Sequence, residues 1–139
     1  NPNTFRRCKI DAAERTSHAA IVAMHRSLIV LRKSDPRILS HDRFDGAILG
    51  PEAFCMRWIS RSHGDLLGVV NFGHDLEIAH PAEPLLAPLE DSSWTMTWSS
   101  EEITWGGGGA VAPEDELGNW RLQAESFALL DGSRARRPS

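Results

Sequence analysis

The sequence has no tyrosine, only two cysteines, and no apolar run long enough to span a bilayer. Cys8 and Cys55 lie far apart and form no metal-type pair, so we interpret them as two reduced thiols. Reduced thiols indicate a reducing compartment, and we therefore expect a cytoplasmic protein. No basic segment followed by an apolar segment opens the sequence, so neither membrane insertion nor secretion is indicated.

The sequence also has no excess of basic residues. The 15 Lys and Arg residues are outnumbered by 19 Asp and Glu residues, which gives a formal net charge of -4 at pH 7. This balance provides no electrostatic reason to expect nucleic acid or an anionic membrane as a partner. The basic residues Arg134, Arg136 and Arg137 cluster near the end of the chain, and we expect residues 133–139 to form a disordered, solvated tail.

The most continuous apolar run is DLLGVVNF, from Asp65 to Phe72. It shows no polar alternation, which is typical of a strand buried on both faces. The preceding segment, Ala53 to Ile59, alternates along its length, so the two segments are predicted to form a hairpin. One predicted face of the earlier strand carries Phe54, Met56 and Trp58, and the other carries Cys55, Arg57 and Ile59.

A helix is predicted in the N-terminal part of the chain, because Ile21, Met24, Leu28 and Leu31 recur at spacings of three and four residues. Thr16 or Ser17 is the expected N-cap, and the pair 35–36, Asp-Pro, is expected to end the helix. An apolar stripe of this width needs a partner surface. Either the sheet that follows or a missing partner covers it.

The remaining patterns predict short strands separated by turns. We expect residues 37–50 to be a connector that holds one small strand, and residues 51–132 to form the sheet domain. The 139 residues are enough for one domain with a real core. Because no helices separate the strands, we predict a mainly β fold, an antiparallel β-sandwich preceded by one N-terminal α-helix. The expected later strands include Leu76 to Ile78, Trp94 to Trp98, Trp120 to Leu122, and Ser126 to Leu130.

No residue pattern predicts catalysis, a metal site or a cofactor. The six histidines are spread over the chain, and His18 and His25 are too far apart for a zinc pair at spacing i, i+4. Acidic residues at 101–102 and 114–116 could supply a glycosidase carboxylate pair, but we interpret them as solvated loop residues. Residues 106–109 are four glycines, but they lack the Lys-Ser or Lys-Thr of a phosphate-binding loop, so a flexible loop is expected.

Tryptophan is unusually frequent, with five residues. Trp58, Trp94 and Trp98 occupy positions that alternation assigns to the core. Trp105, beside the glycine run, and Trp120 are the better candidates for exposure. An exposed pair would allow contact with a carbohydrate such as an α-glucan, and packing within loops is the alternative.

Five segments occur in the same order as in a known enzyme family. The chain resembles the C-terminal part of malto-oligosyltrehalose trehalohydrolases, which belong to the alpha-amylase superfamily. The resemblance extends from residue 1 to about residue 130. The segments are NPNTFRRCKID, HAAIVAMHRSLIVLRKSDP, GDLLGVVNFGHDLEI, PAEPLLAP and WSSEEITWGGGG.

The resemblance implies that residues 1–36 are the last loop and helix of a catalytic (β/α) barrel and that a C-terminal β-sandwich follows. The nucleophile, the acid/base and the stabilising carboxylate of this family lie upstream, so none is assigned to this chain. The implied role is a non-catalytic accessory region of a trehalose-releasing glycoside hydrolase. Its implied partner is the missing barrel, or a second copy bound through the helix face.

Two other functions remain open from the residues. The chain is alternatively a free-standing carbohydrate-binding module that uses Trp105 and Trp120. A third possibility is an independent small enzyme that uses Glu101 or Glu114.

Overall fold

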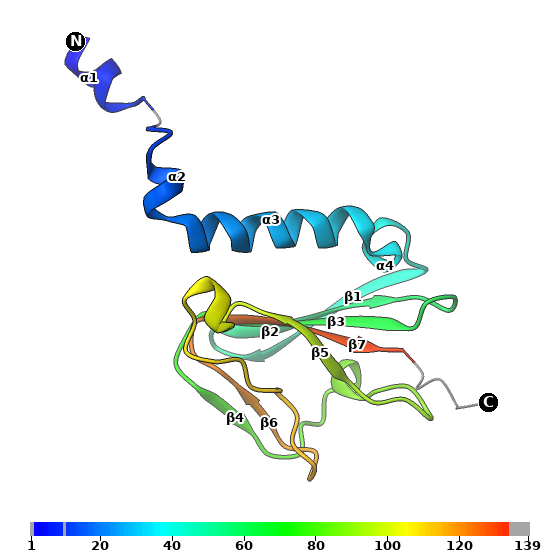
Figure 1. The fold of residues 1–139 in the computed structure, drawn as a ribbon. Helices are drawn as coiled ribbons and strands as arrows, with labels where there is room; N and C mark the ends of the chain where they lie inside the picture. Colours follow the sequence, from blue (N-terminus) through cyan, green and yellow to red (C-terminus); the bar gives the residue numbers. More distant parts are fainter. Residues whose placement is uncertain (1, 10, 134–139) are drawn as a thin grey trace.

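The computed structural model describes residues 2–9 and 11–133 (Figure 1). Helical segments dominate the N-terminal part, and strands dominate the rest. The helices are α1 (Pro2–Arg7), α2 (Glu14–Ser17), α3 (Ala19–Ser34) and α4 (Pro36–Leu39), with 3-10 turns η1 (Pro84–Leu86) and η2 (Ile103–Trp105). The strands are β1 (Arg43–Gly50), β2 (Ala53–Ile59), β3 (Asp65–Asn71), β4 (Leu76–Ile78), β5 (Thr95–Ser99), β6 (Trp120–Leu122) and β7 (Ser126–Gly132).

The strands form two antiparallel sheets. The larger sheet has the order β1-β2-β3-β7-β5, and β4 pairs with β6 in a smaller sheet. Figure 1 shows α3 over one face of the larger sheet and the β4-β6 pair over the other. The prediction of a mainly β sandwich preceded by an α-helix is therefore confirmed.

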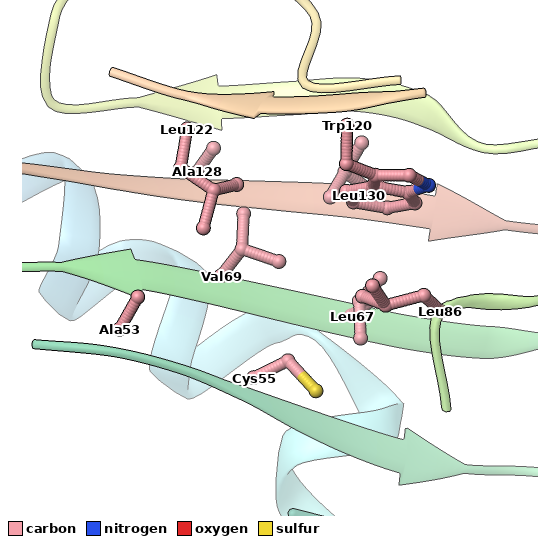
Figure 2. Packing of buried hydrophobic residues seen from close by; sticks show 9 residues of the cluster. All are labelled: Ala53, Cys55, Leu67, Val69, Leu86, Trp120, Leu122, Ala128 and Leu130. Atoms are coloured by element: carbon pink, nitrogen blue, oxygen red, sulfur yellow. The ribbon is translucent and has the colours of Figure 1, made fainter. Parts of the chain in front are cut away.

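The predicted hairpin of β2 and β3 is confirmed, and it lies at the centre of the larger sheet. All seven residues of β3 are buried, because both of its faces are covered. Leu67 and Val69 point toward the smaller sheet, where they meet Trp120 and Leu122 of β6 (Figure 2). Leu66, on the opposite face, packs in the cluster that contacts α3.

The helix α3 is confirmed, but its predicted start is wrong. His18 precedes the helix and makes no side-chain capping hydrogen bond. The Ser17 hydroxyl instead donates to the Glu14 carbonyl within the short helix α2 (3.1 Å). The predicted end is correct, because Pro36 cannot continue α3 and starts the single turn of α4.

The segment expected to be a connector contributes a full strand. β1 has eight residues and pairs along β2, with Gly46 opposite Met56. The sequence Asp45-Gly46 is a common turn signal, but here pairing with β2 outweighs that local preference. The N-terminal segment expected to be a loop likewise contains the short helix α1. None of the described helices has the length and hydropathy needed to cross a membrane.

β5 contains a bulge that changes the face of its side chains. The expected alternation would place Trp94, Met96 and Trp98 on one face. Instead the register shifts between Met96, which pairs with Leu130, and Trp98, which pairs with Leu129. Trp94 and Met96 therefore pack against the core between the sheets, whereas Trp98 lies in the cluster beneath α3.

Candidate functional site

The two tryptophans predicted to bind carbohydrate do not lie together. Trp120 is only 2% exposed, so the expectation that it is solvent-accessible is wrong. It is buried because β6 turns its ring toward β3 and β7 (Figure 2). Trp105 is half-buried, and its ring stacks on Trp98, with centroids 6.1 Å apart. Its indole Nε1 donates to the Ser99 carbonyl (2.9 Å), and the two candidates belong to different clusters.

Two of the acidic candidates, Glu101 and Asp115, accept hydrogen bonds within their loops. Asp115 accepts from the amides of Leu117 and Asn119, which closes a turn, and these bonds lower the pKa of its carboxyl. A Glu101 carboxylate oxygen accepts from the Gly108 amide (3.2 Å). Burial and the nearby charge of Asp115 raise the pKa of Glu114. The carboxylates thus shape two separate loops, 101–109 and 114–119.

The glycine run folds back on itself and does not present amides for a phosphate. The backbone amides of Gly106, Gly107 and Gly109 donate to carbonyls of residues 101–103, and the amide of Gly108 binds the Glu101 side chain. A phosphate site needs backbone amides directed at the ligand. The predicted loop is therefore confirmed.

The described part of the chain contains no cluster of metal-ligating side chains. No group of three or more His, Cys, Asp or Glu side chains there is placed to hold a metal ion. His25 Nδ1 lies 2.8 Å from the Ile21 carbonyl, and His41 Nδ1 lies 3.2 Å from the Arg37 carbonyl. Cys8 is exposed and Cys55 is buried, and both are free thiols.

A hollow of about 470 Å³ lies beside the smaller sheet, and Val111, Pro113, Trp120 and Arg121 are among its lining residues. Arg121 forms an ion pair with Asp75 (2.8 Å), so its charge is used within the protein. Trp120 lines the hollow but is only 2% exposed, because it belongs to the core. The other polar residues of the lining are Glu77, Asp115 and Asn119, and the Asn119 side chain donates to the Asp115 carboxylate (3.1 Å), so most of these polar groups are already paired within the protein.

The most elaborate polar cluster is structural. Arg57 and Asp65 form a buried ion pair across β2 and β3, with Nη2 and Oδ2 2.7 Å apart. Arg57 Nη1 also donates to the carbonyls of Leu85 (2.9 Å) and Ala87 (2.6 Å), and its guanidinium lies 5.0 Å from the centre of the Trp94 ring. These contacts fasten the proline-rich segment around η1 to the sheet.

A second arginine fixes the end of α3. Arg37 of α4 makes two hydrogen bonds to Asp35 (2.9 and 2.7 Å) and an ion pair with Asp131 of β7 (3.0 Å). The Arg37 guanidinium lowers the pKa of Asp35. At the middle of α3, Trp98 Nε1 donates to the Ser27 hydroxyl (2.9 Å). The helix is therefore held on the sheet by polar as well as apolar contacts.

The apolar stripe of α3 lies mostly on the sheet. Met24, Leu28 and Leu31 are half-buried against the cluster of Leu66, Trp98 and Leu129, so the sheet is the partner that the stripe requires. Other apolar side chains of α3 remain accessible, and none of its residues is fully buried. Those that stay exposed are Ile21 (46%), Ile29 (52%) and Val30 (63%).

Comparison with known proteins agrees with the resemblance noted in the sequence. Residues 41–128 match a family described as "Domain of unknown function (DUF3459)". The chain is 32% identical over 95 residues to a malto-oligosyltrehalose trehalohydrolase from Rhizobium sp. (strain M-11). The match covers 66% of this chain and 16% of that protein, so the chain spans only a small part of its relative. The predicted resemblance is confirmed.

Proposed function

The chain belongs to the DUF3459 family, and from this membership we propose that it is the C-terminal accessory region of a trehalose-releasing glycoside hydrolase. The observation that carries the proposal is the 32% identity to a malto-oligosyltrehalose trehalohydrolase. The complete enzyme would hydrolyse the α-1,4 bond next to the terminal trehalose unit of a maltooligosyl-trehalose, using two carboxylates with retention. Those carboxylates would come from the part of the enzyme that this chain does not match.

In this proposal, residues 1–36 complete the catalytic barrel and the strands from β1 onward form the accessory sandwich. Arg37 and Ser27 bind the helix to β7 and β5, so in this proposal α3 would lie between the sandwich and the rest of the barrel. Ile29 and Val30 project away from the sandwich and are available to the barrel. The region would therefore act by covering one flank of the barrel. The free thiols fit a cytoplasmic enzyme.

A chimera tests this function. The segment of the Rhizobium sp. (strain M-11) enzyme that matches this chain is replaced by the chain, and trehalose release from maltooligosyl-trehalose is measured. We expect release by the chimera, and none by the isolated chain. The control is the same enzyme truncated before the matched segment, which should lose stability. Sugar release by the isolated chain would instead support an independent enzyme.

The alternative function, a carbohydrate-binding module, requires two exposed tryptophan rings, but Trp120 is buried in the core. Titration of the chain with maltooligosaccharides, followed by tryptophan fluorescence, tests whether Trp105 alone binds the sugar. We expect no saturable change. Saturable binding that disappears in Trp105→Ala would favour the module.

A further inference from the structure

The face of the larger sheet that carries α3 continues beyond the helix. Residues directly opposite each other in an antiparallel pair share a face, so the pairing of Phe44 with Trp58 and of Ile48 with Phe54 places these side chains on the α3 side. The Phe72 ring lies 6.1 Å from the Phe54 ring, which extends the same surface past β3. We call this surface the outer sheet patch, and its members are Phe44, Ile48, Phe54, Met56, Val70 and Phe72.

This patch is apolar, and three of its six members are exposed, whereas Phe54 and Met56 are half-buried and Val70 is buried. Ile48 is 83% exposed, Phe72 is 70% exposed and Phe44 is 49% exposed. The α3-side positions of β1, β2 and β3 include no charged residue. Isolated exposed apolar residues are ordinary, but a continuous group on one sheet face marks an interaction surface.

Helix α3 covers the adjacent half of this sheet face, and it indicates which kind of structure would cover the patch. There, α3 lays Met24, Leu28 and Leu31 on the sheet, and the residues beneath it, Leu66 and Leu129, are at most 2% exposed. A layer of helix that continues beside α3 would bury the patch in the same way. The matched segment is only 16% of the relative, so most of that protein remains to supply such a layer.

We propose that the outer sheet patch is a docking surface for the catalytic region of the same polypeptide. This inference rests on the proposed function and extends it, because it assigns the contact to the sheet as well as to α3. The side chains of the patch carry no charge and none is a strong hydrogen-bonding group, so the patch fits an apolar protein surface better than an anion or the hydroxyl groups of a sugar.

Cysteine labelling tests the patch with little disturbance of packing. Cys8 is replaced by serine, because it is the exposed native thiol in the described part of the chain. Ile48→Cys then reports on the patch, and Leu117→Cys, which is 75% exposed on the 115–119 turn, is the matched control. Both variants are made in the isolated chain and in the chimera described above, and the rate of maleimide labelling at each site is measured by mass spectrometry.

We expect both cysteines to react at similar rates in the isolated chain. In the chimera, labelling at Ile48→Cys should fall at least about tenfold, because a buried thiol reacts only through local opening, while Leu117→Cys should be unchanged. Phe72→Cys, at the other end of the patch, should behave like Ile48→Cys and guards against a local effect of one substitution. Protection of both patch sites supports the proposal whether or not the chimera is active.

Three results would overturn it in distinguishable ways. Unprotected patch cysteines in a chimera that releases trehalose would remove the patch and leave the proposed function standing. Unprotected cysteines in an inactive chimera would count against both. Slow labelling of Ile48→Cys in the isolated chain, together with a dimer mass by light scattering, would identify a second copy as the occupant.

Discussion

The two faces of the five-stranded sheet are covered to different degrees. Toward β4 and β6, the side chains of β3 and β7 meet a second layer, and Leu67 and Leu130 are at most 1% exposed (Figure 2). Toward α3, Leu66 and Leu129 are equally buried, but Ile48 and Phe72 on the same face are open to solvent. One face is complete within the chain, and the other is complete only beneath the helix.

Buried residues within the strands therefore do not show that the whole sheet face is covered. Hydrogen bonds as well as apolar packing close the core between the sheets, since the Arg57 guanidinium binds carbonyls of the η1 segment and holds that segment over the core. On the α3 face, polar contacts hold the helix at its C-terminal end through Arg37 and at its middle through Ser27. The stability of the chain should therefore depend more on residues of the closed face, and the predictions below compare changes on that face with changes around α3.

The largest effect is expected for Asp65→Ala. This change leaves the Arg57 guanidinium buried without its carboxylate partner, and loss of one member of a buried pair costs about 3–5 kcal/mol. Urea denaturation measures the free energy of unfolding. Arg121→Ala removes the exposed pair with Asp75 and is the control, with an expected cost below about 1 kcal/mol. Equal costs for the two variants would contradict the structural role of the buried pair.

The second prediction compares neighbouring leucines on opposite faces of β3. Leu67→Ala and Leu66→Ala remove equally buried side chains, and such truncations cost about 2–5 kcal/mol. We expect Leu67→Ala to lie in the upper half of this range, because both walls of its cavity are sheets. Leu66→Ala should lie in the lower half, because α3 is able to move toward the cavity. A larger loss for Leu66→Ala, by the same denaturation assay, would reverse the proposed order.

Acid should weaken the fastening of α3. The Arg37 guanidinium lowers the pKa of Asp35. Burial would raise the pKa of Asp131, but hydrogen bonds from Ser133 and Arg37 outweigh it and leave the pKa lowered. A lowered pKa in the folded state contributes stability that is present above the unfolded value of about 4 and is lost as the pH falls through the folded value.

We therefore expect the free energy of unfolding to decrease below about pH 4 and to decrease less steeply in Asp35→Asn. Asparagine is a suitable replacement, because its side-chain oxygen still accepts from the Arg37 amide at the start of α4. Urea denaturation across the acid range measures both slopes. Identical slopes in the two proteins would show that the Asp35 carboxylate does not contribute.

The smallest effect is expected for Ser27→Ala. The change removes the acceptor of the Trp98 indole N–H, and loss of one such hydrogen bond costs about 1 kcal/mol. Ser34→Ala, at an exposed position of the same helix, is the matched control and should be nearly neutral. Tryptophan fluorescence during unfolding reports the change, and a neutral Ser27→Ala would mean that this hydrogen bond does not help to hold the helix.

Much of the sheet was predictable from local pattern. The apolar run of β3 and the alternation of β2 predict the central hairpin because each pattern needs a specific burial on its faces. β1 was underestimated because Asp45-Gly46 resembles a turn, and only pairing with β2 keeps it extended. The burial of Trp120 could not be predicted, since it depends on where the three-residue strand β6 is placed over the larger sheet.

The candidate surface was less accessible to sequence reasoning. The sequence predicts the apolar stripe of α3, but it does not decide whether the sheet or a missing partner covers that stripe. Phe44, Ile48 and Phe72 carry no local signal of exposure, because apolar residues in strands are ordinarily buried. Their exposure follows from the position of α3, which covers only part of the face.

The bulge in β5 has a consequence for how the chain tolerates changes in length. It places Trp94 on one side of the sheet and Trp98 on the other within five residues. Thr97 is the extra residue, so deleting it would make the pairing with β7 regular and leave the Trp98 indole opposite Leu129 on the α3 side. The strand should therefore tolerate the loss of one residue between the two indoles, whereas the loss of two would move Trp98 into the space between the sheets and away from the Ser27 hydroxyl.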